Sequence, residues 1–478
     1  MRKIALLSLV ILNACMGAPA YRQPPVAVPA AYRETGAGSV AAQPLPRAEA
    51  ARANDPVEFE AGFLTSLGDT TLTRLTEEAL RANLDVRAAQ ARVRQARALR
   101  SRALLDLTPE GVASGGFTRR RFASASFPGA SGRLPDESVW DAGFDAAWEI
   151  DLFGRLRGNI RAQDAFVAVS REDLRGVLVA LTAELARSYF ELRGAQEQLA
   201  VAERNAENQR RTLALTRDRL DAGRGSAFDT ERALAQLNIT LATIPSRQAQ
   251  VAAAQYRIGV LVGRSPTSVA AELGPVSAQP ALPDSVPVGS PETITRHRPD
   301  VAAAERYAAA QSALTGSARA EYLPRLSVGG SVGLTAGEVS GLGDNGSFRY
   351  AVGPVVSFPL LNLGRVRTGV NAAAAREEEA RAQYGQVVLS AIEEVETALA
   401  RYHASRSRVA QLAEASAASG RAADLARMRF TEGVADFLQV LDAERTQLES
   451  EELLAQGKTD AATAYAALYK ALGGSTGS

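Results

Sequence analysis

The sequence predicts a mainly helical fold built from two copies of one unit, each with a long helical hairpin and a pair of β-strands. The first observation is a repeated opening, Gly-Arg-apolar-Arg, at 154–157 and 364–367. The second is a repeated Arg-apolar-x-x-Gly segment, at 219–223 and 429–433, that closes each long helix. Between opening and close there is no proline, and apolar residues step by four and three, as on one face of a helix.

The apolar steps form a heptad-like seam with polar flanks, which is typical of helices that pack along their length. A helix of roughly 65 residues would be about 100 Å long, whereas ordinary globular helices run roughly 8–20 residues. On periodicity alone, a purely structural coiled coil is an equally good interpretation. The seam comprises Leu174, Leu178, Leu181, Leu185, Tyr189 and Leu192 in the first copy, and Val388, Ile392, Val395, Leu399 and Tyr402 in the second.

Composition excludes several classes of function. A net charge of +1 argues against a nucleic-acid surface, and arginines well mixed with acidic residues are typical of solvated helix faces. One cysteine and two histidines exclude a disulfide within the chain and argue against a Cys/His metal cluster. There is no nucleophile elbow and no phosphate-binding loop, so we expect neither an enzyme nor a cofactor or metal.

The N-terminus predicts export. Residues 1–14 read as a signal peptide, with a positive start and an apolar core that is too short to span a membrane as a helix. The core ends at Leu12-Asn13-Ala14-Cys15, which resembles a bacterial lipobox, so Cys15 is the predicted lipidation site. The alternative is an ordinary signal peptide with a chance cysteine. Residues 15–56 are rich in Pro, Ala and Gly and predict a lipidated, extended tether.

The two halves of the chain are one unit duplicated, because segment 85–109 matches segment 300–324 without a gap. We expect helix at 70–105, and we expect Pro245 to kink or break the helix that returns from the first closing glycine. The predicted boundaries are 57–263 for the first repeat, 264–291 for the linker, 292–472 for the second repeat and 473–478 for a loose tail.

Each repeat also contains a predicted strand hairpin with a Gly-containing loop, at 108–152 and 324–360. Each strand has about the length that crosses a bilayer at a tilt. A soluble β-layer is the alternative, since alternation is a weak signal. A four-stranded sheet exposed to lipid would leave unpaired edges, which lipid does not tolerate, so strands in a membrane would require several copies of the chain to close one barrel.

Segments in both halves resemble the TolC/OprM-type outer-membrane efflux family, and within it the NodT-like lipoproteins. The resemblance extends from about residue 55 to residue 472 and includes the lipobox. The matching segments are Trp-Glu-Ile-Asp-Leu-Phe-Gly-Arg at 148–155, Arg-Pro-Asp-Val-Ala-Ala-Ala-Glu at 298–305, Gly353-Pro354 with Phe358-Pro359, and Gly-Val-Ala-Asp-Phe-Leu-Gln-Val-Leu-Asp-Ala-Glu-Arg at 433–445.

The resemblance implies a homotrimer in which each chain gives four strands to one twelve-stranded barrel in outer-membrane lipid. The long helices would form a tube in the periplasm. Function would be passive conduction of drugs or other small molecules, delivered by an inner-membrane RND pump and a periplasmic adaptor. An outer-membrane channel for type I protein secretion is the closest alternative, and a structural coiled-coil lipoprotein is a further one.

The closing segments are the first candidate site. A glycine at the end of each long helix supplies the positive-φ turn of a helical hairpin, and Ser226 and Asp436 can cap the returning helices. The resemblance adds binding of the adaptor at these tips, with Asp436 departing from the serine of the family motif. The implied adaptor-binding residues are Arg219, Leu220, Gly223 and Ser226 in the first copy and Arg429, Gly433 and Asp436 in the second.

The second candidate site is a pore aperture just past the second tip. The family's two acidic positions correspond to Gln439 and Asp442, of which only Asp442 is charged. Three carboxylates around a symmetry axis would repel one another and attract cations. A solvated helix-face charge is the alternative for Asp442. The resemblance also implies a contact that holds the closed tip, between Asp229 and the aromatic position Phe430.

Overall fold

The structure is a computed structural model, and it describes residues 21–34, 67–126, 128–129, 132–274, 276–283, 286 and 288–474. The predicted signal peptide, the lipidation site Cys15, most of the tether and residues 475–478 lie outside the described residues. The chain divides into two compact units. We call residues 1–25, 92–171 and 303–385 the sheet unit, and residues 26–91, 172–302 and 386–478 the hairpin unit.

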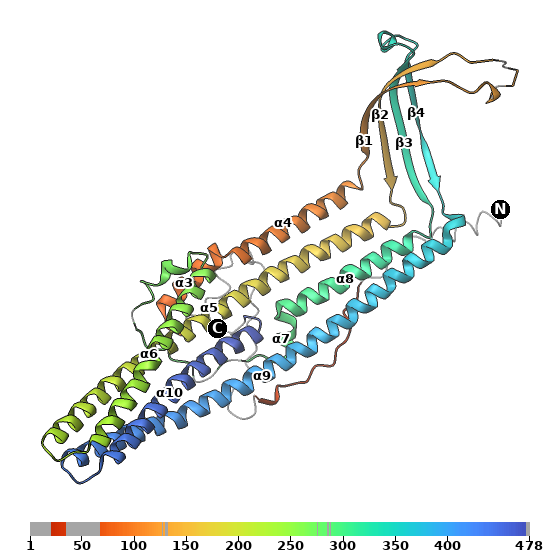
Figure 1. The fold of residues 1–478 in the computed structure, drawn as a ribbon. Coiled ribbons are helices and arrows are strands. Elements are labelled where there is room, and N and C mark those ends of the chain that lie inside the picture. Colours follow the sequence, from red (N-terminus) through yellow and green to blue (C-terminus); the bar gives the residue numbers. More distant parts are fainter. Residues whose placement is uncertain are drawn as a thin grey trace. The chain divides into compact units, whose positions relative to one another are not determined.

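The sheet unit contains both predicted strand hairpins, which join in one sheet of order β1-β2-β3-β4 (Figure 1). All three pairings are antiparallel, and β2 pairs with β3, so the sheet joins the two repeats. Glycine-rich strands let backbones approach closely: a Cβ on Gly333 would lie 2.8 Å from the carbonyl oxygen of Ala142. The strands are β1 (Glu110–Arg120), β2 (Glu137–Ile150), β3 (Arg325–Ala336) and β4 (Phe348–Ser357).

The outer strands of this sheet are β1 and β4, and large apolar side chains are exposed along the sheet. Isolated sheets with unpaired edges and exposed apolar side chains are aggregation-prone in water. The exposed apolar side chains are Val112, Phe117, Phe144, Trp148, Val332, Phe348, Tyr350, Val352, Val355 and Val356.

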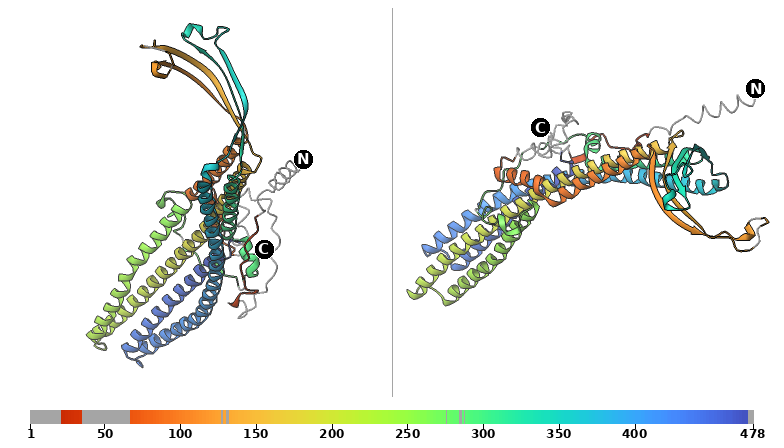
Figure 2. Two further views of the ribbon diagram at one scale, coloured as in Figure 1. Left: turned by 90° about the vertical axis from the view of Figure 1, so that its right-hand side faces the viewer. Right: turned by 90° about the horizontal axis from the view of Figure 1, so that it is seen from above.

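The helices repeat as the sequence predicts, and the two pairs of long helices form hairpins (Figures 1 and 2). The return helices are of equal length, 35 residues each, and equivalent positions in them differ by 210 in number. The helices are α3 (Thr70–Ala82), α4 (Leu84–Leu105), α5 (Arg155–Asp221), α6 (Ala227–Leu261), α7 (Pro291–His297), α8 (Pro299–Ala320), α9 (Leu363–Thr431) and α10 (Phe437–Ala471). Among the described residues, no helix is both long and apolar enough to cross a membrane.

Two local expectations need correction. The stretch 70–105 is two helices, because Asn83 adopts an extended backbone and its Oδ1 accepts hydrogen bonds from the N–H groups of Asp85 and Val86. Pro245 does not break α6, which continues through it. Ile244, packed in the cluster at the hairpin tips, and Val251, packed against the main core, hold the helix on both sides of the proline. This packing outweighs the loss of one backbone hydrogen bond.

The predicted seam forms the main core of the hairpin unit. Tyr189 and Leu192 of α5 are buried together with Leu399 and Tyr402 of α9. Burial of such side chains is worth about 1.5–3 kcal/mol each. The proline-containing linker joins this core, since Val269, Leu273, Val286 and Val288 are buried in it, and so does Tyr32 from the described part of the tether.

Candidate functional site at the hairpin tips

The first hairpin turns at Gly223, which has φ +68°. Its N–H donates to the carbonyl oxygen of Leu220 at 2.9 Å, and the N–H of Arg224 donates to that of Arg219 at 2.8 Å. These two bonds are a Schellman motif, which closes the end of a helix. The hydroxyl of Ser226 then accepts from the N–H of Phe228 at 3.2 Å and caps α6.

The second hairpin repeats this turn at Gly433, with φ +80°. The N–H groups of Gly433 and Val434 donate to the carbonyl oxygens of Phe430 and Arg429 at 3.0 and 2.9 Å. Asp436 replaces serine as the cap, and its Oδ1 accepts from the N–H of Gln439 at 3.1 Å. The predicted glycine turns and helix caps are therefore confirmed in both copies.

The two tips are joined by Arg219. Its Nη2 donates to the carbonyl oxygens of Phe430 at 2.7 Å and Thr431 at 3.2 Å, at the end of α9. Its guanidinium lies 4.2 Å from the centre of the Phe430 ring, which makes a cation–π contact. A positive charge at the C-terminus of a helix also interacts favourably with the helix dipole. Arg219 thus fastens the first hairpin to the second.

An apolar cluster lies beneath this contact. The rings of Phe430 and Phe437 are 5.7 Å apart, and both side chains are buried. Leu213 of α5 and Leu237 of α6 pack in the same cluster, so both hairpins contribute to it. The ends of the two hairpins lie side by side in every view (Figures 1 and 2).

The predicted closed-tip pair occupies this region. Asp229 is half-buried in the first turn of α6, where its N–H donates to the carbonyl oxygen of Ser226 at 3.1 Å and its carboxylate suits the positive end of the helix. Phe430 directs its ring to Arg219 and Phe437. The contact between Asp229 and Phe430 stays a prediction.

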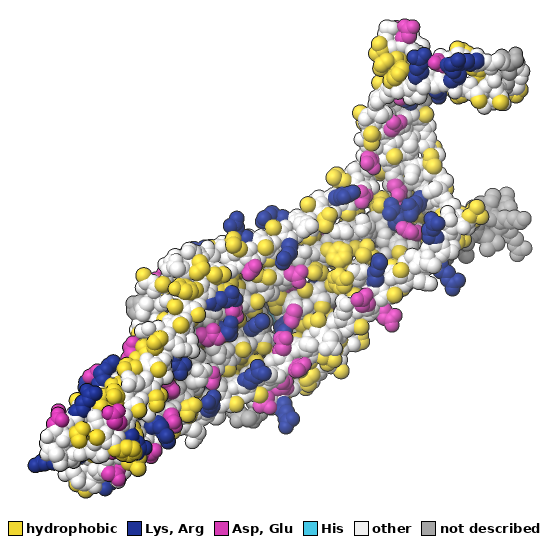
Figure 3. Space-filling view, in the orientation of Figure 1, with side chains coloured by type: hydrophobic (Ala, Val, Ile, Leu, Met, Phe, Trp, Pro, Cys, Tyr) yellow, Lys and Arg dark blue, Asp and Glu magenta, His cyan; other side chains and the backbone are white. Residues whose placement is uncertain are grey.

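The predicted aperture residues are both exposed on α10. Asp442 lies 3.6 Å from Arg445 one turn further on, and its side chain is 68% exposed. Charged side chains of both signs are interspersed over the helices on the face drawn in Figure 3. The aperture role of Gln439 and Asp442 stays a prediction.

Sequence reasoning missed a buried carboxylate behind the tips. Glu444 is 3% exposed, and its Oε1 accepts hydrogen bonds of 2.8 Å from Thr212 Oγ1 of α5 and from Arg427 Nε of α9. It therefore joins α10 to both long helices. An exposed carboxylate on a charged helix would look the same in the sequence, so there was no signal to find it.

Two residues at the other end of the hairpins act as equivalent caps. Asn83 Nδ2 donates to the carbonyl oxygen of Leu261 at the end of α6, at 2.9 Å. Arg298 Nη1 donates to that of Ala471 at the end of α10, at 2.7 Å. The Arg-Pro-Asp segment that carried part of the family resemblance thus has a structural role in this chain.

Arg298 also pairs with two carboxylates, through contacts of 2.6 Å with Asp300 and 2.7 Å with Glu394. Burial alone would lower the pKa of Arg298, but the hydrogen bonds and charges of these carboxylates raise it. Burial alone would raise the pKa of Asp300, but the hydrogen bond and charge of Arg298 hold it below its ordinary value. The cap is therefore a charge-assisted network.

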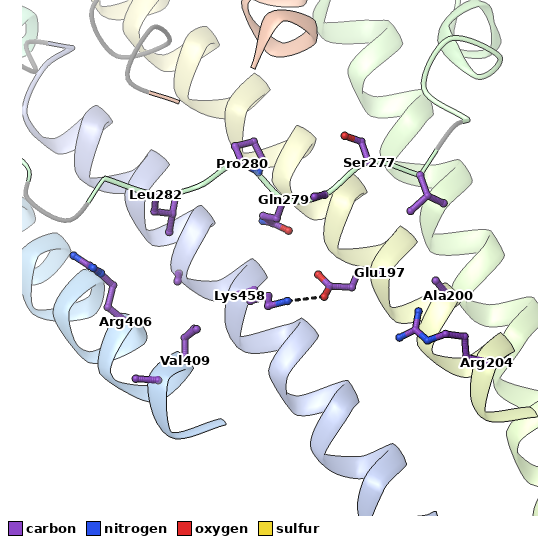
Figure 4. Close-up of a pocket in the computed structure, with 14 residues that line it drawn as sticks. Glu197, Ala200, Arg204, Ser277, Gln279, Pro280, Leu282, Arg406, Val409 and Lys458 are labelled. Carbon is purple, nitrogen blue, oxygen red and sulfur yellow. Dashed lines mark hydrogen bonds and ion pairs between the residues drawn. The ribbon is translucent and has the colours of Figure 1, made fainter. Parts of the chain in front are cut away.

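A groove of about 620 Å³ lies between the linker and helices α5, α9 and α10 (Figure 4). Lys458 Nζ and Glu197 Oε1 form an ion pair of 2.8 Å across it. Gln279 and Leu282 line the linker side. Within the described residues, no group of three or more His, Cys, Asp or Glu side chains is placed to hold a metal ion.

Comparison with known proteins extends over nearly the whole chain. The family described as outer membrane efflux protein matches residues 75–264 and 291–474. The chain is 32% identical to outer membrane protein OprJ of Pseudomonas aeruginosa, covering 98% of this chain and 95% of OprJ. It is 28% identical to nodulation protein T of Rhizobium leguminosarum bv. trifolii, covering 97% and 95%. The solved structure of the outer-membrane channel OprN superposes with a TM-score of 0.86 at 36% identity, covering 97% of this chain and 100% of that one.

Proposed function

The chain belongs to the outer membrane efflux protein family, and from this premise we propose that it is the outer-membrane channel of a tripartite efflux system. The observation that carries the proposal is the joined pair of hairpin tips, where Arg219 and the Phe430–Phe437 cluster make one firm end out of two helical hairpins. A firm, polar end with repeated turns suits docking of a periplasmic adaptor. The chain conducts and does not catalyse.

The channel would be a homotrimer. Strands β1 and β4 are the edges of the sheet, and edges cannot face lipid unpaired. Three copies with four strands each would close a twelve-stranded barrel, in which β1 of one copy pairs with β4 of the next. By the strand register, eight of the ten exposed apolar side chains share one face of the sheet, all except Val112 and Val355, and that face would then be in contact with outer-membrane lipid.

The adaptor would bind at the exposed surfaces of the two tips. Gly223, Ser226, Gly433 and Asp436 shape the turns, and Arg429 is exposed beside them. Arg219 and Leu220 are partly buried, so they would act mainly by holding the surface in shape. A periplasmic adaptor would connect this end to an inner-membrane RND pump, which selects drugs or other small molecules.

Two further parts of the proposal concern lipid and ions. Cys15 would be acylated and would anchor the chain in the outer membrane, where each buried CH₂ adds about 0.8 kcal/mol. In a Cys15→Ser variant, label from a radioactive fatty acid should be lost; label that persists on the variant would contradict the assignment.

Gln439 and Asp442 would surround the periplasmic aperture of the trimer, and Asp229 with Phe430 would hold the tip closed.

In-cell crosslinking tests the function. A cysteine replaces Ala222, which is exposed beside the first turn, and captured proteins are identified by mass spectrometry. A cysteine at the exposed Ser407 of α9 serves as the control, since it lies far along the helix from the tip. We expect Ala222→Cys to capture an adaptor encoded with an RND pump.

Other outcomes have distinct meanings. An adaptor encoded with an ABC transporter would contradict small-molecule efflux and favour the type I secretion channel. Capture of only the chain itself, or the same capture from both positions, would contradict docking of an adaptor at the tips and leave the trimeric tube standing.

A further inference from the structure

The second repeat has an arginine equivalent to Arg219, but that arginine does not make the equivalent contact within the chain. With the offset of 210, Arg219 corresponds to Arg429, and its acceptors Phe430 and Thr431 correspond to Leu220 and Asp221. Arg429 is exposed. In the described part of the chain its side chain makes neither a hydrogen bond nor an ion pair, although it lies at the same place on an equivalent turn.

The residues equivalent to the acceptors of Arg219 lie at the end of α5, and this helix end has no arginine bound to it within the chain. The end of α5 carries Asp218 and Asp221, which are both exposed, whereas the equivalent positions at the end of α9 are Met428 and Thr431. Carboxylates at the C-terminus of a helix face the negative end of its dipole, which is unfavourable unless a cation lies nearby. Within the described residues, no basic side chain pairs with either carboxylate.

Apolar burial shows the same asymmetry. Leu215 of α5 packs against the tip cluster, where the first hairpin meets the second. Its counterpart in α9 is Leu425, which is 57% exposed. The second hairpin therefore presents an arginine and a leucine in the positions that the first hairpin uses to bind its neighbour.

We infer that Arg429 of one copy caps the α5 helix of a second copy, donating to the carbonyl oxygens of Leu220 and Asp221 and pairing with the Asp221 carboxylate. The occupant is a second copy because this chain supplies both halves of the contact, with opposite charges. The inference rests on the homotrimer of the proposed function. Six tips would then be joined in a ring by six arginines, alternately within a copy and between copies.

The two kinds of contact would differ in chemistry. Arg219 stacks on an aromatic ring and donates to neutral carbonyl oxygens, whereas Arg429 would meet Leu220 and a carboxylate. An exposed ion pair is screened by salt, and a contact over an aromatic ring is screened less. The tips should therefore separate between copies at higher salt, while each pair of hairpins stays joined.

Thiol crosslinking in the purified, detergent-solubilised protein tests the placement. A disulfide needs Cα atoms within about 7 Å, and an arginine side chain holds its acceptor further away, so a short bismaleimide is the reagent. The pair Arg429→Cys with Asp221→Cys should give dimer and trimer bands on a denaturing gel. The matched pair Arg219→Cys with Thr431→Cys should give only crosslinked monomer. The natural chain has a single cysteine, so background is low.

The experiment distinguishes a wrong placement of Arg429 from the absence of a trimer. If light scattering of the purified, detergent-solubilised protein shows a trimer but the Arg429–Asp221 pair yields only monomer, the inference is wrong and the trimer stands. If light scattering shows a monomer, both are wrong.

A charge exchange tests the interaction itself. Arg429→Glu and Asp221→Arg should each make the tips separate between copies at lower salt, and the two together should restore the wild-type salt midpoint. Separation is followed as the loss of bismaleimide-crosslinked dimer and trimer between cysteines placed at the exposed Ala222 and Glu432. A double variant no more stable than the worse single variant would overturn the ion pair. Glu414→Arg on α9, exposed and away from the tip, should leave the midpoint unchanged.

Discussion

The carboxylate of Glu444 accepts a hydrogen bond of 2.8 Å from the hydroxyl of Thr212, and this bond joins the return helix of the second hairpin to the long helix of the first. Both residues are buried. Arg427 of α9 donates to the same oxygen atom, so one carboxylate holds three helices. A buried carboxylate is costly unless it is paired and hydrogen-bonded, and both conditions are met here.

Glu444→Ala should destabilise the hairpin unit. The change leaves the Thr212 hydroxyl and the Arg427 guanidinium without their acceptor, and loss of hydrogen bonds to a charged group costs about 1.5–3 kcal/mol. The measurement is the urea midpoint in detergent by circular dichroism. Glu414→Ala, on an exposed face, is the control and should change stability by less than about 0.5 kcal/mol. Equal midpoints for both variants would contradict the role of Glu444.

Gly194→Ala should also destabilise the hairpin unit, because the added methyl group would overpack the contact between two helices. A Cβ on Gly194 of α5 would lie 2.9 Å from the Cβ of Thr459 in α10, so the two helices would have to move apart. Overpacking typically costs about 1–3 kcal/mol. Gly420→Ala is the matched control in α9, where nothing lies within 4 Å of an added Cβ, and it should stabilise by about 0.5–1 kcal/mol. Thermal unfolding of the two variants should therefore shift in opposite directions.

The Arg298 cap predicts a pH dependence. The pKa of Asp300 is lower in the folded chain than in the unfolded chain. The ionised Asp300 carboxylate therefore stabilises the folded chain at pH values above its unfolded-state pKa of about 4, and this stabilisation is lost as pH falls through the folded-state pKa. Wild type should therefore be more stable than Asp300→Asn at pH 7, and the difference should shrink below about pH 4. Denaturant titrations of both proteins from pH 7 to pH 3 measure this difference in the free energy of unfolding. A difference that stays constant over this range would rule out the linkage.

The aperture assignment predicts ion selectivity. If three copies of Asp442 surround a narrow opening, Asp442→Ala should raise conductance and weaken cation selectivity in planar bilayers, because repulsion among carboxylates and attraction of cations are both lost. Glu449→Ala is the control, since that carboxylate is similarly exposed on the same helix two turns further from the tip. Reversal potentials that are unchanged in Asp442→Ala would contradict the assignment.

Several features followed from local rules in the sequence. The apolar steps of four and three predicted the long helices and the buried seam through Tyr189 and Leu399, because helical periodicity depends only on spacing. Gly223 and Gly433 predicted the turns, because only glycine enters positive φ without strain. The same kind of rule predicted that Pro245 would kink or break its helix, and the break does not occur, since packing on both sides of the proline keeps α6 continuous.

The sequence by itself thus determined the duplication, the long helices, the strand hairpins and the turn chemistry, all of which arise within short stretches of chain. Only the tertiary structure decided which partners meet. It placed Arg219 on Phe430, buried Glu444 between Thr212 and Arg427, and made Asn83 and Arg298 equivalent caps on different helices. These contacts join residues far apart in the chain, and an arginine or glutamate on a helix face looks the same in the sequence whether water or another helix receives it.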